Sequence, residues 1–560
     1  MIRQKNKNWL LTGLLFAFIA PNSMAQPQKK EEGPYPSATP QFVFSEKLSE
    51  QEEQLKNNPL TLRFAKSRQK LASDKYRPLY HFVSPENMLN DPNGLCYWQG
   101  KWHLFYQAYP ADEFPAAADI KKRRQHWGHA VSEDLVHWRD LPYAIYPGIE
   151  KMCFSGSTWV DKDRVIAFYP GIGAGQMTAV SKDPLLLNWD KSGPLNCDAG
   201  DADIWKEGET YYGLVGSREI YNEKSPGLPS SFFSSAYKYA LWPQWKLWSS
   251  RDLKNWSSEG SLLSGNTPFT AKYDDGACPN FQPIGDKNIM LWFSHSNGGQ
   301  YFLGDYDSVA HKFTPYDHGR FNHGRVAPGG VHAPSAAGDG KGGVINILNI
   351  NDAKQSDDWD QIMSLPQQLS LNENKSLHIE PVASVTSLRT KHRYVGQTAL
   401  PANKEIVLKT IQGNSMELNV EIDPEMSHWV QLNVLRSAHA EEQTSITFYN
   451  YDRKLTYWYD TQAEVVLDGS RSSTLNDVWV RPPERAVIDR GEKLLKLRVF
   501  IDKSVVEVFV NGRQYLAMRV YPGRDDSVGV SLLAEGRNAT LKSLDAWEMK
   551  PIWPVKANSK

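Results

Sequence analysis

Residues 88–94 read Met-Leu-Asn-Asp-Pro-Asn-Gly, and the strand-like stretch Leu95-Cys96-Tyr97-Trp98 follows directly. The first run has the composition of a turn, because Asn and Asp hydrogen-bond their own backbone, Pro fixes φ and Gly accepts a positive φ. Such a run by itself predicts a turn before a strand and no particular chemistry. Its meaning depends on the motifs that follow it along the chain.

Aromatic and polar motifs follow this run in a fixed order. They are Leu104-Phe105-Tyr106-Gln107, Trp127-Gly128-His129-Ala130-Val131-Ser132, Asp134-Leu135-Val136-His137-Trp138 and Phe154-Ser155-Gly156-Ser157. Together with residues 90–94 they resemble the N-terminal signature of glycoside hydrolase family 32, which contains β-fructofuranosidases, invertases, inulinases and levanases. The resemblance implies that the chain acts on a sugar and that Asp91 is the nucleophile.

The composition suits a protein that handles carbohydrate and argues against two other classes of partner. Aromatic residues make up 12% of the 560 residues, including 19 Trp, and such rings serve both β-cores and stacking against sugars. The formal net charge is -1, which gives no electrostatic footprint for nucleic acid or an anionic membrane. We expect a carbohydrate partner, and the sequence leaves the oligomeric state open.

The N-terminus has the pattern of a secretory signal peptide. Basic residues precede an apolar stretch at 9–20, and Ser23-Met24-Ala25 forms a small-residue exit, so we expect cleavage after Ala25. The apolar stretch is short for a membrane span, and no later segment of about 20 apolar residues occurs. The sequence therefore predicts a signal peptide at 1–25, no membrane span, and a secreted or periplasmic protein.

The rest of the chain divides into an arm and two β-rich domains. Residues 26–75 are first polar and Pro-punctuated and then helix-patterned, which predicts a flexible and helical N-terminal arm. Residues 76–375 repeat short runs rich in Tyr, Phe, Trp and Val, at 104–107, 165–169, 211–215, 289–293 and 344–348. No long amphipathic helix interrupts the series, so a β-propeller is favoured over a parallel α/β fold. The resemblance implies five blades around a central substrate funnel.

A C-terminal β-sandwich is expected over residues 376–555. Its clearest signal is a hairpin in which Asn511-Gly512 joins two runs of apolar β-formers at 505–510 and 515–520. This hairpin and the closing stretch Asp545-Ala546-Trp547-Glu548-Met549 also resemble the C-terminal module of the same family. The resemblance thus spans about residues 80 to 550, and the predicted fold is all-β, a five-bladed β-propeller followed by a β-sandwich.

The chemistry implied is hydrolysis of a glycosidic bond with retention. That reaction needs two carboxyl groups about 5 to 5.5 Å apart, one attacking the anomeric carbon and the other protonating the leaving oxygen. Asp91 matches the family's nucleophile. The family's sugar contacts correspond to Asn90, Gln107, Phe154 and Ser155.

A third carboxylate of the family, in an Arg-Asp-Pro motif, matches this chain unevenly. Asp201 takes the place of the motif's Asp when Trp205 is used to align the segment, but Gly200 replaces the Arg and Ala202 replaces the Pro. An Arg fork holds two hydroxyls in fixed geometry, so its loss changes how a sugar ring is oriented. Asp203 is the competing assignment.

The acid/base position departs most from the family. The family's Glu-Cys-Pro reads Ala277-Cys278-Pro279 here, and a methyl group cannot donate a proton. Two carboxylates lie just upstream. In a strand, Asp275 would share the face of Ala277, because side chains alternate with period two. We therefore predict Asp275 as the acid, with Asp274 as the less favoured acid and a further substrate contact.

The cysteines leave a disulfide open and give no indication of a zinc site. The chain contains Cys96, Cys153, Cys197 and Cys278, each within a few residues of a sugar-site motif. A disulfide between neighbouring blades is one of two equally weighted outcomes. No Cys-x-x-Cys pair occurs, so a zinc site is not predicted, and no motif calls for a cofactor.

The sequence thus predicts a secreted retaining glycoside hydrolase of the β-fructofuranosidase type, with a fructan or sucrose as the default substrate. Gly200 and Ala277 keep alternatives open. One is a hydrolase for a sugar other than fructose, and another is a glycan-binding protein that has lost the acid. A transglycosylase, which differs mainly in acceptor access, is the third.

Overall fold

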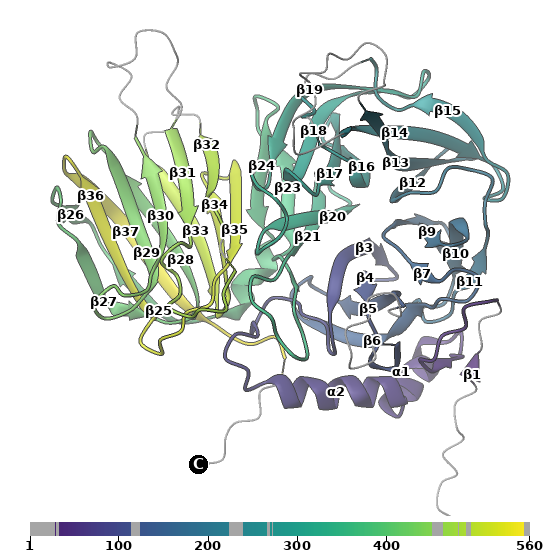
Figure 1. Cartoon of the computed structure of the whole chain (residues 1–560), viewed down its shortest axis with the longest axis horizontal. Helices are drawn as coiled ribbons and strands as arrows, with labels where there is room; N and C mark the ends of the chain where they lie inside the picture. Colours follow the sequence, from purple (N-terminus) through teal and green to yellow (C-terminus); the bar gives the residue numbers. More distant parts are fainter. Residues whose placement is uncertain are drawn as a thin grey trace, which may run out of the picture.

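The structure, a computed structural model, describes residues 28–29, 33–113, 124–222, 239–265, 269–271, 273–450, 463–479, 481–488 and 494–553. The expected signal peptide at 1–25 lies outside these residues. The described chain is all-β apart from two N-terminal α-helices and the short 3-10 helices Ala111–Glu113 and Ala383–Leu388, with a propeller followed by a sandwich (Figure 1). This confirms the predicted fold class.

Five separate antiparallel sheets form the propeller blades. The first contains β3 (Leu89–Trp98), β4 (Lys101–Ala108), β5 (His126–Ser132) and β6 (Trp138–Ile145). The second contains β7 (Met152–Cys153), β8 (Ser157–Asp161), β9 (Arg164–Ile172), β10 (Gly175–Ser181) and β11 (Asp190–Ser192). The third contains β12 (Ala202–Glu207), β13 (Thr210–Asn222), β14 (Tyr239–Ser250) and β15 (Ser257–Ser261). Consecutive strands thus make each sheet.

The fourth and fifth blades follow the same plan. The fourth contains β16 (Ala277–Ile284), β17 (Lys287–Ser294), β18 (Gly298–Asp307) and β19 (Lys312–Arg320). The fifth contains β20 (Val331–Gly338), β21 (Val344–Ile350), β22 (Ile362–Met363), β23 (Gln367–Leu371) and β24 (Leu377–Pro381). Contacts between β3, β8, β12, β16 and β20 run from blade to blade and return from β20 to β3. These are the inner strands, and they close a ring.

The apolar runs seen in the sequence are the second strands of the blades. Residues 104–107, 165–169, 211–215, 289–293 and 344–348 lie in β4, β9, β13, β17 and β21 respectively. Each of these strands is paired on both sides within its sheet. A strand covered on both faces by neighbouring blades is apolar nearly throughout, because neither face meets water.

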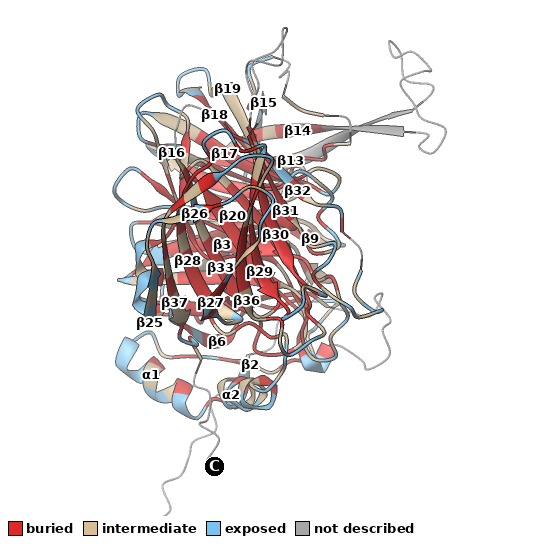
Figure 2. Cartoon of the chain, turned by 90° about the vertical axis from the view of Figure 1, so that its left-hand side faces the viewer, coloured by how far each residue is buried: buried red, intermediate tan, exposed pale blue. Residues whose placement is uncertain are grey.

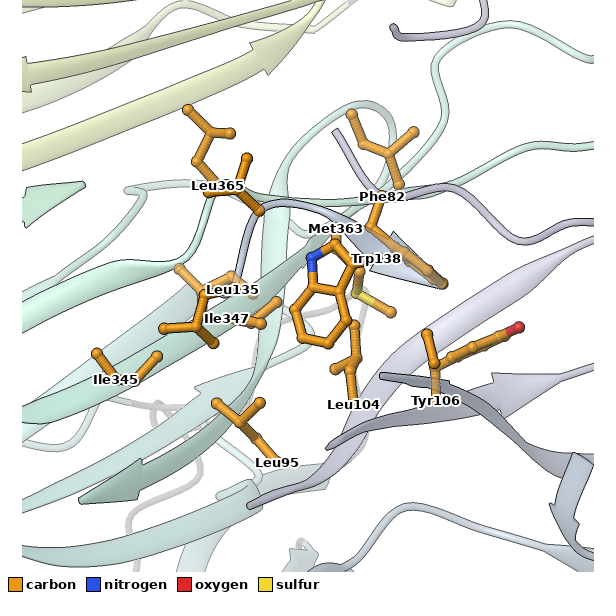
Figure 3. Packing of buried hydrophobic residues seen from close by; sticks show 14 of the residues in the cluster. Phe82, Leu95, Leu104, Tyr106, Leu135, Trp138, Ile345, Ile347, Met363 and Leu365 are labelled. Atoms are coloured by element: carbon orange, nitrogen blue, oxygen red, sulfur yellow. The ribbon is translucent and has the colours of Figure 1, made fainter. Parts of the chain in front are cut away.

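An apolar seam joins the first and last blades (Figure 3). Its buried side chains come from the first blade and its approach, and from the fifth blade: Phe82, Leu95, Leu104, Tyr106, Leu135, Trp138, Ile345, Ile347, Met363 and Leu365. Burial of this apolar surface holds the ring closed. A backbone hydrogen bond from Met363 N to Phe82 O, 2.9 Å long, adds to it.

The C-terminal domain packs two antiparallel sheets face to face. One contains β25 (Arg389–Val395), β26 (Thr398–Leu400), β28 (Ser415–Asp423), β33 (Leu495–Asp502), β34 (Val505–Val510), β35 (Gln514–Arg519) and β37 (Ala539–Met549). The other contains β27 (Ile406–Gln412), β29 (Trp429–Arg436), β30 (Thr444–Tyr449), β31 (Ala463–Asp468), β32 (Glu484–Ile488) and β36 (Gly529–Glu535). The predicted hairpin is β34–β35, which turns at Asn511-Gly512. A separate hydrophobic core lies between the sheets.

The N-terminal arm contains the two-stranded pair β1 (Gln28–Lys29) and β2 (Gln41–Phe42) and the helices α1 (Leu48–Lys56) and α2 (Pro59–Leu71). Asn58 caps α2 by accepting from the amides of Leu60 and Thr61, and Pro59 occupies its first position. Figure 2 shows buried residues concentrated in the strands, whereas α1 carries an exposed face. Among the described helices, none has the length and apolar character needed to cross a membrane.

The two domains meet through buried charged groups at the entry to the first blade. His81 Nδ1 lies 2.9 Å from Asp502 Oδ2, and its Nε2 lies 3.2 Å from Glu507 Oε1. The same Glu507 oxygen accepts from Leu365 N in the fifth blade, at 3.0 Å. One carboxylate of the sandwich therefore binds both ends of the propeller.

One local expectation changes in the structure. Residues 90–94 are not a turn before a strand but part of β3 itself, where pairing with β4 shifts register on either side of Pro92 and Asn93. Gly94 has φ +47° within this irregular segment, and a Cβ there would meet Thr158 Cγ2 at 2.5 Å. The turn-forming residues therefore serve a bulged inner strand.

Candidate active site

The predicted site residues converge because they occupy equivalent places in successive blades. Asp91 lies near the start of β3, Asp201 directly precedes β12, and His332 is the second residue of β20. Ser155 and Asp275 each lie two residues before the inner strands β8 and β16. The beginnings of the five inner strands meet on one side of the ring, so each blade contributes a side chain.

Asp91 is the most completely supported of these groups. Its side chain is buried, and its Oδ2 accepts from Ser155 Oγ at 2.6 Å and from Gln107 Nε2 at 3.3 Å. His332 Nε2 lies 3.0 Å from Oδ1. Burial alone would raise the pKa of Asp91, but the interactions with His332 and Ser155 outweigh it and hold the pKa below its ordinary value. Asp91 is therefore ionised at neutral pH.

Hydrogen bonds fix the orientation of the neighbouring polar groups. Asn351 Nδ2 donates to His332 Nδ1 at 2.6 Å, which leaves the ring proton on Nε2, facing Asp91. The same Nε2 lies 3.3 Å from Asn90 Oδ1. Asn90 Nδ2 donates to Gln107 Oε1 at 2.8 Å. Asn90 and Gln107 thus form a short network beside the carboxylate.

A thiol joins Asp91 to Asp201. Cys278 Sγ lies 3.5 Å from Asp91 Oδ2 and 3.6 Å from Asp201 Oδ2, and the Cys278 amide is 3.4 Å from the same Asp201 oxygen. Burial and the charge of Asp91 raise the pKa of Asp201 to about 7. The two carboxyl groups therefore differ in proton affinity, with Asp91 ionised and Asp201 holding its proton near neutrality.

Position 200 has no room for the family's Arg in this backbone. A Cβ on Gly200 would overlap the carbonyl oxygen of Gly216 on β13 and would lie 3.1 Å from Val215 Cγ1. The Gly216 amide donates to Asp201 O at 2.8 Å, which holds the two segments together. The absence of Arg is thus built into the packing of the third blade.

The competing residue Asp203 lies in a different environment from Asp201. It is fully buried, and its Oδ2 accepts from Phe281 N on β16 at 2.7 Å. Burial raises its pKa to about 6. Asp203 thus links the third and fourth blades, whereas Asp201 lies beside Cys278 and the nucleophile position.

The residues around the missing glutamate form two separate groups. Ala277 is the first residue of β16, so Asp274 and Asp275 lie in the preceding loop and not in the strand from which their facing was predicted. Asp274 is fully buried and accepts from Ala271 N at 2.7 Å and Asn297 Nδ2 at 2.7 Å. Its carboxylate holds this loop to the turn after β17.

Asp275 contacts a histidine across the same hairpin. Its Oδ2 lies 2.6 Å from His295 Nδ1, and its Oδ1 accepts from His295 N at 3.1 Å.

Phe154, the remaining predicted sugar contact, is half-buried, and its carbonyl accepts from Trp127 Nε1 at 2.9 Å. This hydrogen bond holds Phe154, the neighbour of Ser155, at the edge of the second blade.

Sequence reasoning missed His332 and His295. His332 contacts Asp91 across 241 positions of sequence, and no motif pairs the two. His295 had a weak signal, because the turn at Gly285-Asp286 predicts that β16 and β17 pair as a hairpin. The four cysteines are free, so the structure contains no disulfide between blades.

Comparisons with known families agree with this architecture. The model described as "Glycosyl hydrolases family 32 N-terminal domain" matches residues 81–225 and 235–381, and "Glycosyl hydrolases family 32 C terminal" matches residues 384–548. These matches cover most of the chain and meet at the junction between propeller and sandwich.

Individual relatives are distant but nearly full-length. The levanase of Bacillus subtilis (strain 168) is 27% identical over 517 residues, covering 86% of this chain and 71% of that protein. The sucrose-6-phosphate hydrolase of Escherichia coli is 26% identical, covering 85% of this chain and 95% of that protein. Fructan 1-exohydrolase IIa from Cichorium intybus has the same fold, with a TM-score of 0.71 and 22% identity over 85% of this chain and 98% of that chain. The chain belongs to glycoside hydrolase family 32, the family of β-fructofuranosidases, invertases and levanases.

Proposed function

We propose that the protein hydrolyses the bond to a terminal fructosyl unit of a fructan or of sucrose, with retention of configuration and with Asp91 as the nucleophile. The observation that carries this proposal is the state of Asp91: buried, ionised, and held by His332, Ser155 and Gln107 where the inner strands meet. A carboxylate fixed in one orientation is what attack on an anomeric carbon requires.

Asp201 is proposed to bind the same sugar ring. With a pKa raised to about 7 by burial and by Asp91, its carboxyl group donates a hydrogen bond to a sugar oxygen when protonated and accepts one when ionised. Asn90, Gln107 and Ser155 add amide and hydroxyl groups around it. Because Gly200 leaves no Arg fork, the sugar relies on these uncharged groups for its orientation.

The choice of fructosyl substrates follows from the relatives, since a levanase and a sucrose-6-phosphate hydrolase match over most of this chain. Secretion is proposed from the basic and apolar pattern of residues 1–25. N-terminal sequencing of protein recovered outside the cytoplasm checks it: a mature chain that begins after Ala25 is expected, and retained Met1 would contradict it.

The test of function is hydrolysis of sucrose, inulin and levan by the purified protein, with Asp91→Asn as the background control. Free fructose is measured, and NMR follows the anomeric form that appears first. Release of the retained anomer supports the proposal. A first product with inverted configuration contradicts the assignment of Asp91 as the nucleophile. Release of another monosaccharide from a wider glycan panel transfers the reaction to a different sugar, and binding without any cleavage identifies the protein as a glycan-binding member of the family.

A further inference from the structure

An aspartate–histidine pair lies next to the position where the family's glutamate is missing. Asp275 holds both the backbone amide and the ring Nδ1 of His295, at 3.1 and 2.6 Å. The Asp275 side chain is 6% exposed, whereas that of His295 is 63% exposed. The carboxylate thus fixes the imidazole and leaves Nε2 on the opposite, accessible side of the ring.

This pair lies at the end of the β16–β17 hairpin that carries position 277, where the family has its glutamate. Ala277 on β16 pairs with Phe293 on β17, and the register shifts immediately after Ala277. Asp275 and His295 each lie two residues beyond this pair at the same end of the hairpin. His295 thus lies at the end of the hairpin that carries position 277, next to the residue that stands in place of the glutamate.

A chain of ring contacts connects His295 to the nucleophile. The Phe293 ring lies 4.8 Å from the ring of His295 and 5.2 Å from the ring of His332, centroid to centroid. His332 Nε2 in turn lies 3.0 Å from Asp91 Oδ1. His295 therefore lies on the same side of the ring as Asp91, close enough for its charge to act on that carboxylate.

The charges around His295 favour its protonated form. Its pKa is raised by the hydrogen bond to Asp275, against burial, and the negative charges of Asp275 and Asp91, joined by that of Asp201 when it is ionised, raise it further. In return, the charge of His295 lowers the pKa of both Asp91 and Asp201. These charges thus increase the share of His295 that carries the proton an acid needs.

We propose that His295, held by Asp275, is the proton donor that replaces the glutamate absent at position 277. This rests on the hydrolysis proposed above and names the acid for it. In the first step Asp91 forms a bond to the anomeric carbon, the bond to the leaving oxygen breaks, and Nε2–H gives that oxygen its proton. In the second step neutral Nε2 takes a proton from water, whose oxygen bonds to the anomeric carbon as the bond to Asp91 breaks.

Asp275 acts in this scheme as a positioning residue. Its oxygens are directed at His295, and the little-exposed carboxylate is separated from a substrate by the imidazole it orients. In this arrangement Asp275 orients the His295 imidazole and favours its protonated form. The sequence had instead predicted that Asp275 itself donates the proton. An aspartate that orients a histidine through Nδ1 fixes which nitrogen exchanges the proton.

The decisive experiment compares two leaving groups in His295→Gln. The rate on sucrose or a fructan, whose alcohol leaving group needs a proton, is expected to fall by about 10² to 10⁴-fold, the usual contribution of general acid catalysis. The rate of glycosyl transfer to Asp91 from a nitrophenyl fructoside is expected to change by less than about tenfold, because that leaving group departs without protonation. Azide should restore turnover of the nitrophenyl substrate, since it needs no base.

A matched control comes from the same blade architecture. His137 is also a half-exposed histidine whose Nδ1 contacts an aspartate, Asp134, at 2.7 Å, but it lies on the turn after β5, among groups remote from Asp91. His137→Gln should leave both rates unchanged. Restoring the family residue provides the converse test: Ala277→Glu added to His295→Gln is expected to recover at least tenfold of the lost rate on sucrose or fructan.

The pH profile separates positioning from direct donation. Removal of the carboxylate in Asp275→Asn should move the upper pH limit of kcat/KM to lower pH, while Asp275→Glu retains part of the wild-type profile. Asp91, Asp201 and His332 are unchanged in both variants, so their titrations are common to the comparison. A leaving-group contrast in Asp275→Asn with none in His295→Gln overturns the proposal in favour of Asp275 as the acid.

Other outcomes are equally distinct. If His295→Gln shows no contrast and Asp201→Asn does, Asp201 is the donor and the proposal fails while the proposed hydrolysis stands. If the wild-type protein cleaves neither the natural nor the nitrophenyl substrates, the proposed function fails and takes the acid assignment with it.

Discussion

At the residue scale, the site is defined by how burial and neighbours divide protons among its groups. Asp91 is buried and Asp201 partly buried, yet the pKa of Asp91 lies below its ordinary value and that of Asp201 rises to about 7. The difference arises because Asp91 accepts from the Ser155 hydroxyl and has the His332 ring 3.0 Å from its Oδ1, whereas Asp201 faces a thiol and the negative charge of Asp91. Two like residues thereby differ in proton affinity.

Asp91→Asn is expected to lower kcat/KM at least about 10³-fold, because covalent catalysis has no substitute for the carboxylate. Asn retains an acceptor for Ser155, so the fold should persist. Hydrolysis assays on the substrate that proves active, with the melting temperature as the control, check this. Activity within tenfold of wild type would exclude Asp91 as the nucleophile.

The cysteines make a separate prediction about redox state. Burial raises the pKa of Cys96 and Cys197 to about 12 and that of Cys278 well above its ordinary value. Thiol titration without reductant should therefore find four reactive groups in denaturant and slow reaction in the native protein at pH 8. Two titratable thiols in denaturant would instead reveal a disulfide.

Sequence predicted the residues that sit inside motifs and missed those that reach the site from another blade. Short motifs contain Asp91, Asp201 and Gln107, and the structure brings these three side chains close together. His332 was missed, because its contact with Asp91 depends on the last inner strand meeting the first. Local patterns carry no information about that meeting, which results from closure of the ring.

At the element scale, inner and second strands have opposite characters. The second strands are apolar because neighbouring strands and blades cover them, and their five runs were already visible in the sequence. The inner strands are irregular and begin with polar residues, so their composition resembles that of turns. The bulged start of β3 was misread for this reason.

The register between β16 and β17 explains why the sequence indicated Asp275 without its partner His295. The short turn at Gly285-Asp286 pairs Ile284 with Lys287, but the register shifts by one between Asn280 and Ala277. This irregularity, with Cys278 at φ +46°, brings Asp275 opposite His295. Period-two alternation in one strand predicts neither the shift nor the partner.

Gly94→Ala tests the bulged segment of β3. The added methyl requires a left-handed backbone at φ +47°, which costs about 1 to 2 kcal/mol, and it overlaps Thr158 Cγ2, which adds about 1 to 3 kcal/mol. Thr158→Ser removes that methyl and keeps the hydroxyl that donates to Gly94 O at 2.9 Å. The double variant should recover the packing part of the lost unfolding free energy and not the backbone part.

Denaturant unfolding of the two single variants and the double variant supplies the comparison. Equal stability of Gly94→Ala and wild type would show that the segment relaxes freely. Full recovery in the double variant would show that crowding, and not the backbone conformation, demands glycine at this position.

At the scale of the whole molecule, propeller and sandwich form one structural unit. The apolar cluster at the seam continues into the sandwich, where it includes Phe500, Phe509 and Tyr515. His81, Asp502 and Glu507 lie within this region without solvent exposure. Removing one partner of such a buried group is expected to cost about 3 to 5 kcal/mol, because the other charge is left unpaired.

His81 should make stability depend on alkaline pH. Burial lowers its pKa, but the hydrogen bonds to Asp502 and Glu507 outweigh this and raise it from 6.5 to about 9. Because the folded pKa exceeds the unfolded one, the stabilisation is complete below about pH 6.5 and is lost as pH rises through about 9. Its full size is on the order of 3 kcal/mol.

The check is the free energy of unfolding of wild type and His81→Gln between pH 6.5 and 9.5. Wild type should lose more stability over this interval than the variant, whose residue 81 does not titrate. Parallel pH dependences in the two proteins would show that His81 is not protonated in the folded state.

Because Glu507 contacts both His81 and Leu365, these contacts also have an order during synthesis. His81 and Glu507 are 426 positions apart, so at about 5 to 20 residues per second the first blade waits roughly 20 to 85 s for its carboxylate to be translated. During that interval the apolar edge of the first blade lacks the sandwich, and until residue 381 is translated it also lacks the fifth blade. The seam between the first and fifth blades can form once residue 381 has left the ribosome, whereas the contacts of Glu507 form only after nearly the whole chain has emerged. A nascent chain stalled before the fifth blade therefore presents that edge to chaperones and proteases.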